Sequence, residues 1–318
     1  MKLTALSLLS TAMFLAGTGA GSAAPDVVVS IKPIHSLVAS IMKGVSEPKL
    51  IVEGAASPHT FSLKPSNAAT IEGADVIFWV GPGIEAFLEK PLDALASDAT
   101  VIELEDAPGI EKLPFREGGA FEAHDHGHEG EEAHEHGDHD HRDHGSFDTH
   151  LWLDPMNAKA MAAEIEKTLV EADPVNAATY QANGAALLKE IDALDAELKT
   201  TIAPVKDKPF IVFHDAYQYF EHRYGIRVAG SITVSPENMP GAERIDQIHR
   251  KVTELGATCV FAEPQFEPKL VSVVTEGTPA RSGVLDPEAA TLKEGPSLYF
   301  ELMRGLASSM KECLSQEM

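Results

Sequence analysis

The stretch Pro174–Ile202, PVNAATYQANGAALLKEIDALDAELKTTI, decides how the chain is organised. Apart from the Asp173-Pro174 step at its start, it has almost no turn-forming chemistry, so it predicts one continuous helix. A helix of roughly 29 residues, at 1.5 Å per residue, is about 43 Å long. A helix of that length can cross from one domain to another.

Strand-like and helical patterns alternate on both sides of this stretch. Strands are expected before it at 26–30, 49–53, 75–81 and 101–104. They are expected after it at 210–214, 226–232, 259–263 and 283–286. The helical patterns that separate them are typical of parallel sheets covered on both faces. The sequence therefore predicts an α/β fold, in which one long helix joins two β/α lobes with mostly parallel sheets.

The expected organisation has four parts. A signal peptide is expected over 1–24, a first lobe over 25–172, the linking helix over 173–203 and a second lobe over 204–318. A chain of 318 residues is long enough for two domains with real cores.

The first residues have the features of a secretory signal. Lys2 supplies the positive start, Leu6–Ala16 is apolar, and small residues follow up to Ala24. The alternative is a short membrane anchor, but this segment is too short to span a bilayer comfortably. No cysteine follows the apolar run, so a lipid anchor is not expected. We expect an exported, soluble protein of the periplasm.

The net charge of the chain restricts the kinds of partner that it can bind. It contains 49 acidic and 25 basic residues, for a formal charge of -24. This charge argues against nucleic acid and anionic membrane surfaces as partners. It suits attraction of cations, although acidic soluble proteins are common.

Two cysteines are present, Cys259 and Cys313. In an exported protein they are expected to pair, which would tie a predicted strand to the C-terminal helix. Two free or metal-binding thiols remain the alternative, although the separation fits no zinc-ribbon spacing.

A His-rich segment interrupts the first lobe at about 116–147. Positions 124–144 hold eight histidines and eight acidic residues, a composition that cannot form a packed core. We expect a disordered loop whose imidazoles chelate zinc with modest affinity, because wrapping a metal costs conformational entropy. The alternative is a solvated, dispensable insertion. The expected accessory ligands are His124, His126, His128, His134, His136, His139, His141 and His144.

A second set of candidate ligands lies near strand ends. Ligands of open α/β sheets bind outside the carboxyl ends of the strands. His59 follows the second expected strand, His214 ends the fifth, and Asp286 ends the eighth. His150 lies just past the His-rich segment. Three imidazoles and a carboxylate form a four-coordinate set that suits Zn²⁺.

Each candidate also has a plainer explanation. His59 could be a plain loop residue, and His150 could be the tail of the His-rich run. His214 could be a hydrogen-bonded core histidine, and Asp286 could cap the turn that follows it. Glu263 lies at another strand end, where it could support a ligand or bind weakly. Three further histidines read as structural or surface residues: His35, His222 and His249.

Catalytic motifs are missing from the sequence. It contains no HExxH helix, no GxSxG turn and no Walker loop. Asp148 and Asp154 flank His150 and could orient its ring.

Six segments, in order, resemble a known family: SPHTFSLKPS, DTHLWLDP, FHDAYQYFEHRYG, SPENMPGAERI, CVFAEPQF and GVLDP. The chain resembles the ZnuA-type periplasmic zinc-binding proteins, the metal-binding cluster A-I of ABC-transporter solute receptors. The resemblance implies two β/α lobes joined by one long rigid helix, with metal between the lobes. Carried over, the ligands fall on His59, His150 and His214, with Asp286 as the fourth.

The details of the resemblance favour zinc. The family includes manganese receptors, and in these the position that matches His214 resembles Glu rather than His. Some zinc members carry an acidic residue where this chain has Pro58, so Asp286 is the expected carboxylate here. Zinc members also carry a His- and acid-rich loop, and enterobacterial members share the paired cysteines, which supports Cys259–Cys313.

The expected function is that of a periplasmic Zn²⁺ receptor. It would deliver zinc to a membrane permease driven by a cytoplasmic ATPase, and it is expected to be monomeric. We do not expect an enzyme, because four protein ligands leave no position for an activated water. The alternatives are a manganese or iron receptor on the same fold, a zinc hydrolase that uses Glu263 as base, and a buffer acting through the loop alone.

Overall fold

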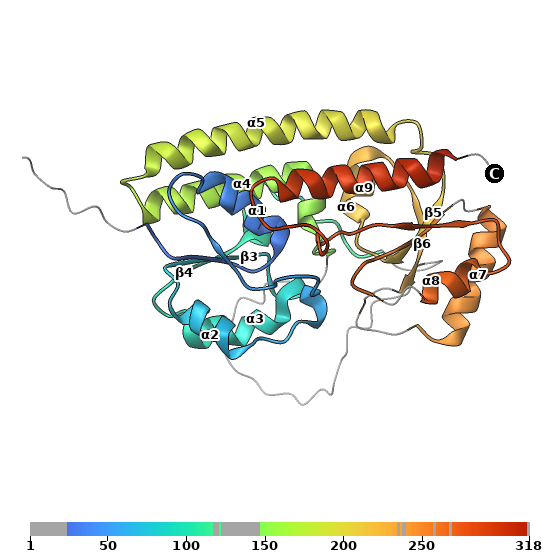
Figure 1. Ribbon diagram of the computed structural model, residues 1–318, viewed down its shortest axis with the longest axis horizontal. Helices are drawn as coiled ribbons and strands as arrows, with labels where there is room; N and C mark the ends of the chain where they lie inside the picture. The colour runs from blue at the N-terminus through green and yellow to red at the C-terminus, as the bar shows by residue number, and fades with distance from the viewer. Residues whose placement is uncertain are drawn as a thin grey trace, which may run out of the picture.

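The computed structural model describes residues 24–116, 121, 147–233, 236, 240–256, 259–266 and 269–316. The expected signal peptide, apart from Ala24, and the eight histidines of 124–144 lie outside these residues. The described chain forms two parallel four-stranded sheets with helices around them, as the sequence predicts (Figure 1).

The first sheet lies in the N-terminal half of the chain. Its strands are β1 Val27–Val29, β2 Lys49–Leu50, β3 Val76–Trp79 and β4 Thr100–Glu103, in the order β2-β1-β3-β4. Helices α1 Lys32–Ile41 and α4 Pro155–Ala172 cover one face, and α2 Pro65–Glu72 and α3 Pro82–Leu95 the other (Figure 1). Every residue of β1 and β3 is buried, as expected for strands covered on both faces.

The second sheet repeats this order. Its strands are β5 Phe210–His214, β6 Val228–Thr233, β7 Cys259–Ala262 and β8 Arg281–Val284, in the order β6-β5-β7-β8. The helices of this half are α6 Gln218–Tyr224, α7 Ala242–Leu255, α8 Lys269–Thr275 and α9 Leu298–Ser315. In each sheet, the strand that comes first in the sequence, β1 or β5, therefore lies second from one edge.

Helix α5, Ala177–Ile202, is the long helix that the opening stretch predicts. It begins three residues later than expected, because the Asp173 carboxylate accepts hydrogen bonds from Asn176 Nδ2 and Tyr180 Oη and holds a turn there. Its 26 residues span about 39 Å. Helix α5 runs over both lobes, above α4 and α9 (Figure 1).

The spacing of its buried residues explains how α5 packs. They recur every three or four positions and so form one face of the helix: Tyr180, Gly184, Leu187, Ile191, Leu194, Leu198 and Ile202. Gly184 leaves room for the Glu166 carboxylate of α4, which a Cβ at this position would overlap. This face therefore joins α5 to the core below it.

Helix α9 also crosses between the halves. Its Tyr299 hydroxyl donates to the Trp152 carbonyl at 3.0 Å, and its Tyr299 amide donates to Ser36 Oγ of α1 at 3.0 Å. The residues before α9 are held in the same way, because Lys32 Nζ donates to three carbonyls, those of Ala289, Ala290 and Leu292. The C-terminal segment thus packs against the first sheet's helices as well as its own half.

A disulfide joins Cys259, at the start of β7, to Cys313, near the end of α9, which confirms the expected pairing. Its Cα atoms are 6.2 Å apart. Within the described residues, no helix combines the length and the apolar character that crossing a membrane requires.

Candidate metal centre

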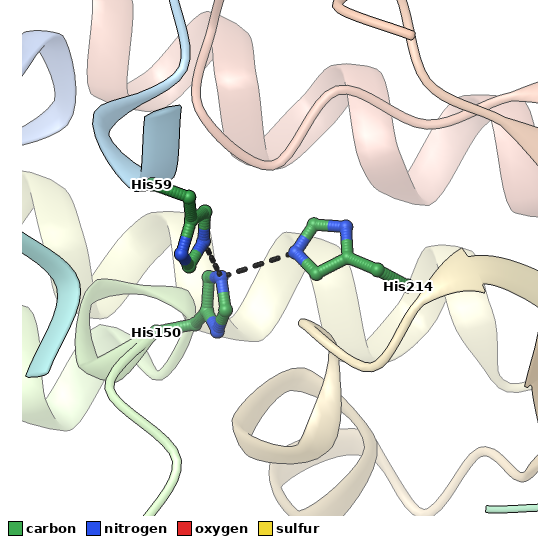
Figure 2. A group of neighbouring side chains, drawn as sticks. All are labelled: His59, His150 and His214. Atoms are coloured by element: carbon green, nitrogen blue, oxygen red, sulfur yellow. Dashed lines mark hydrogen bonds between the residues drawn. The ribbon is translucent and has the colours of Figure 1, made fainter. Parts of the chain in front are cut away.

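Three histidines from distant parts of the chain converge at one point (Figure 2). His59 lies in a short 3₁₀ helix, Pro58–Thr60, and His150 precedes another, Leu151–Leu153. His214 is the last residue of β5, at the carboxyl end of the second sheet. The structure therefore brings together the three histidines that the sequence predicts.

The spacing of their nitrogens suits a metal ion. The Nε2 atoms of His59 and His214 each lie 3.3 Å from Nε2 of His150, and the three ligand atoms all lie within 4.8 Å of one another. Nitrogens bound at 2.0–2.1 Å to a tetrahedral zinc ion are about 3.3–3.4 Å apart. Two of the three spacings thus already match those of zinc ligands.

A carboxylate orients the ring of His214. Nδ1 of His214 lies 2.7 Å from Oε1 of Glu263, and both side chains are 1% exposed. Because the carboxylate only accepts, Nδ1 carries the proton and Nε2 presents its lone pair to the cluster. Burial lowers the pKa of His214, but the charge and the hydrogen bond of Glu263, together with the charges of Glu288 and Asp215, raise it overall.

His150 is oriented in the same way. Its Nδ1 lies 2.7 Å from Oδ1 of Asp148, which also accepts the His150 amide at 3.0 Å. Asp154, the other flanking acid, instead caps α4 by accepting the Met156 amide at 2.8 Å. Of the two acids expected to orient His150, only Asp148 contacts its ring.

The imidazole of His59 is held in its neutral form. Burial, followed by the proximity of His150 and His214, lowers the pKa of His59 well below its usual value. The metal-binding form of an imidazole is the neutral one, so this ring needs no proton removed before it binds.

Within the described residues, the ligand atoms that lie within 4.8 Å of one another belong to the three histidines, and Asp286 is not among them. Its assignment as the fourth ligand stays a prediction. Its carboxylate accepts hydrogen bonds from the amides of Ala290 and Thr291 at 2.9 and 3.1 Å, and from Thr291 Oγ1 at 3.1 Å. Gln265 Nε2 donates to it as well, at 3.3 Å. Asp286 therefore caps the turn after β8, where free backbone amides compete for it.

Sequence reasoning missed Glu288. Its Oε1 lies 3.7 Å from Nε2 of His59, and its side chain is 5% exposed. Burial raises the pKa of Glu288 to about 8, although nearby His214 acts in the opposite direction. The signal that could have found it is a second acid two positions beyond the strand-end Asp286, in LDPE.

The arrangement is suited to holding a cation rather than to hydrolysis. Three imidazole nitrogens face one point, in a largely buried site between the two sheets. Both Glu263 oxygens lie within 2.8 Å of Nδ1 of His214, on the side of the ring away from the cluster. Glu263 therefore does not face a metal-bound water as the hydrolase alternative requires.

The fold and the site define a class: a protein of two parallel α/β lobes with a candidate metal centre between them. The chain belongs to the ZnuA family, described as the periplasmic component A of zinc-uptake complexes, whose model matches residues 27–313. This confirms the family resemblance and the fold class. The family is one of solute receptors, not enzymes.

Its relatives are similar over nearly their whole length. The chain is 57% identical to the high-affinity zinc uptake system protein ZnuA of Brucella suis over 98% of each chain. It is 36% identical to the protein of the same name from Yersinia pestis, over 97% of this chain and 96% of that one.

Solved structures agree with the fold. A crystal structure of a ZnuA covers 92% of this chain and all of its own, with 27% identity and a TM-score of 0.74. A zinc-bound ZnuA deletion mutant matches with 27% identity and a TM-score of 0.72, over 93% of this chain and all of that one.

Proposed function

We propose that this chain is a high-affinity zinc receptor that captures Zn²⁺ and passes it to an uptake transporter. The observation that carries the proposal is the convergence of three buried imidazoles with nitrogens 3.3 Å apart. Membership of a zinc-uptake family and relatives named for high-affinity zinc uptake support the same conclusion.

His59, His150 and His214 are the proposed ligands. Imidazole suits zinc, whereas carboxylate and carbonyl oxygens suit manganese. Three imidazoles at the centre of the site therefore favour zinc over the manganese receptor that was the alternative. Neutral rings bind the ion, so zinc affinity should fall as the histidines become protonated in acid.

The partners and location follow from this proposal. The receptor would work in the periplasm after removal of a signal peptide at 1–24 and would have no lipid anchor. It would bind, as a monomer, a membrane permease driven by a cytoplasmic ATPase. Its lobes would be 25–172 and 204–318, joined by the helix at 173–203.

The His-rich loop at about 116–147 has a secondary role in this proposal. Its histidines, between His124 and His144, would collect or sense zinc with modest affinity. A preformed cleft avoids most of the ordering cost that a loop bears, so the tight site would lie in the cleft. A zinc-bound deletion mutant of a related ZnuA is consistent with a site that tolerates the loss of a segment.

A chelator-competition zinc titration tests the proposal. The mature chain without 122–146 is expected to bind one zinc ion tightly and to resist excess Mn²⁺. His59→Ala and His214→Ala in that background should each abolish tight binding. His222→Ala is the matched control, because the His222 side chain is exposed and His222 is not one of the three clustered histidines.

Two results would contradict the proposal. Loss of all tight binding on removal of 122–146 would place the zinc in the loop. Retention of tight binding in both histidine variants, with the loop absent, would move the site away from the cleft.

A further inference from the structure

Two buried tyrosines follow His214 closely, in the motif FHDAYQYF at the start of α6. Tyr217 is the residue that precedes the helix, and Tyr219 is its second residue. A buried tyrosine hydroxyl normally finds a hydrogen-bond partner. Here the partner of each hydroxyl is a residue that orients a proposed zinc ligand, so the role of both tyrosines rests on the proposed function.

The hydroxyl of Tyr217 supports the ring of His214 by way of Glu263. Tyr217 Oη donates to Glu263 Oε1 at 3.2 Å. The same oxygen lies 2.7 Å from Nδ1 of His214. This second donor restricts the rotation of the carboxylate, and with it the direction in which His214 presents Nε2 to the cluster.

The hydroxyl of Tyr219 acts on His150, which comes from the other half of the chain. Tyr219 Oη donates to the Asp148 carbonyl at 2.6 Å and accepts the Leu113 amide at 3.0 Å. A phenol can both donate and accept, so this one hydroxyl joins two backbone segments. Asp148 Oδ1 in turn lies 2.7 Å from Nδ1 of His150. Helix α6 therefore fixes the backbone that carries the carboxylate behind His150.

Neighbouring contacts hold α6 against the same part of the first half. Gln218 Nε2 donates to the Pro114 carbonyl at 2.8 Å. Arg116 forms ion pairs with Asp215 and, at 2.8 Å, with Glu221. The side chains of these two acids are 8% and 9% exposed, so the ion pairs are largely shielded from solvent. The two tyrosines thus project from a backbone that is fixed to both halves.

We propose that Tyr217 and Tyr219 are positioning residues for zinc. Tyr217 acts on His214 and Tyr219 acts on His150, in each case through the acidic residue behind the ring. The start of one short helix thus sets the relative direction of two ligands that come from different halves of the chain.

The first measurement is zinc affinity of Tyr217→Phe and Tyr219→Phe, each of which removes one hydroxyl and keeps the ring. Chelator competition is carried out on the mature full chain at one equivalent of metal, so that the tightest site fills first. Loss of an outer-shell partner costs about 10- to 100-fold in affinity. Each hydroxyl supports such a partner, so we expect a loss at the lower end, about 10-fold.

Tyr180→Phe is the matched control. Tyr180 is also buried, and its hydroxyl donates to the Asp173 carboxylate at 2.9 Å, in the turn before α5. Its loss should lower the free energy of unfolding, because a buried acceptor loses its donor. Zinc affinity should stay within about 2-fold of wild type, below the cost of losing a supporting contact at the site. A purely structural hydroxyl changes stability without changing affinity.

The second measurement asks whether Tyr217 acts through Glu263. Residues of one hydrogen-bond network have non-additive effects in a double-mutant cycle. The double variant Tyr217→Phe/Glu263→Gln should therefore bind zinc no more weakly than Glu263→Gln alone. One equivalent of Co²⁺ in place of zinc adds a spectroscopic readout, because its visible absorption reports the geometry around the ion. The band should shift in Tyr217→Phe and Tyr219→Phe but not in Tyr180→Phe.

The outcomes separate this inference from the proposed function. If either tyrosine variant binds zinc and Co²⁺ as Tyr180→Phe does, while His214→Ala loses tight binding, the shared positioning role is wrong and the receptor site stands. Additive losses in the double variant would likewise show that Tyr217 does not act through Glu263. If His214→Ala also binds as wild type does, the proposed site itself fails. Thermal unfolding of each metal-free variant shows whether it is folded.

Discussion

At the scale of single residues, the carboxylates behind the imidazoles decide how well the cluster can bind a metal. Glu263 and Asp148 contact Nδ1 of His214 and His150 at 2.7 Å, and both accept a hydrogen bond there. Each therefore selects the tautomer whose Nε2 lone pair faces the cluster. The geometry of the proposed metal centre thus depends on residues that are not themselves proposed ligands.

Glu263→Gln tests this dependence. The amide can donate its own hydrogen to Nδ1, which would shift the His214 proton to Nε2 and occupy the lone pair that zinc needs. We expect zinc affinity to fall about 10- to 100-fold. Chelator competition measures the loss, and Glu254→Gln, an exposed residue of α7, serves as the control. Unchanged affinity in Glu263→Gln would show that the tautomer is set in another way.

The candidate ligand residues differ in how far the sequence could predict where their side chains lie. His59 and His214 were predictable because parallel strands bring their carboxyl ends, and the residues after them, to one edge. Asp286 met the same criterion, yet its carboxylate is held by the amides of Ala290 and Thr291. That competition depends on the conformation of the turn, which strand-end placement does not describe.

At the scale of elements, the start of α3 contains a buried acid with no role in the metal centre. Oε2 of Glu85 accepts hydrogen bonds from the amides of Val80 and Gly81 at 2.8 and 3.0 Å. Burial, opposed by these hydrogen bonds, raises the pKa of Glu85 from 4.5 to about 7. The folded state therefore binds this proton more tightly than the unfolded state does.

Because the pKa of Glu85 is higher in the folded state, the free energy of unfolding should decrease as the pH rises. The stability from Glu85 is fully present below pH 4.5 and is lost as the pH rises to about 7. The loss is about 3 kcal/mol for a shift of this size. Glu85→Gln stays neutral, so we expect it to be more stable than wild type at pH 8 and to show a flatter profile.

Urea unfolding of the metal-free protein at pH 5 and pH 8 measures this difference. Glu221 and Glu288 have raised pKa values too, so only the difference between wild type and Glu85→Gln isolates one group. Glu89→Gln, on the same helix but exposed, is the control. Equal pH profiles for wild type and Glu85→Gln would mean that Glu85 is charged in the folded state.

The order and type of the elements followed from the sequence, but some bounds did not. Strand β2 ends at Leu50 rather than 53, although the Ile51 and Val52 amides still donate to the carbonyls of Val29 and Ser30. Helix α5 starts at Ala177 because the Asp173 side chain holds the preceding turn. The start of α5 thus depends on a side-chain contact, which a periodic pattern does not contain.

At the scale of the whole molecule, the disulfide and the metal centre lie at opposite ends of the second sheet. Cys259 begins β7, whereas His214 ends the parallel strand β5 beside it. The disulfide links residues separated by 54 positions and closes the segment that contains Asp286 and Glu288. Its role should therefore be in stability rather than in metal geometry.

Replacing both Cys259 and Cys313 with Ser tests this separation of roles. The chain-entropy model gives a loss of roughly 4 kcal/mol for a loop of this length. Denaturant unfolding of the oxidised protein and of the double variant measures it. Zinc affinity in native buffer should change less than about 2-fold, well below the cost of losing a supporting contact at the site. A large loss of affinity would show that the bridge shapes the cleft.

The crossing of α9 was not predictable, because an apolar helix face does not identify the sheet against which it packs. Its Tyr299 reaches Ser36 and the Trp152 carbonyl, so residues near the C-terminus complete the core of the first half. A chain still being synthesised lacks this helix until Leu298–Ser315 have been made. The first half consequently cannot finish folding ahead of the second, as N-terminal domains often do. Until α9 has been made, the part of the first half that it covers stays accessible to proteases and chaperones.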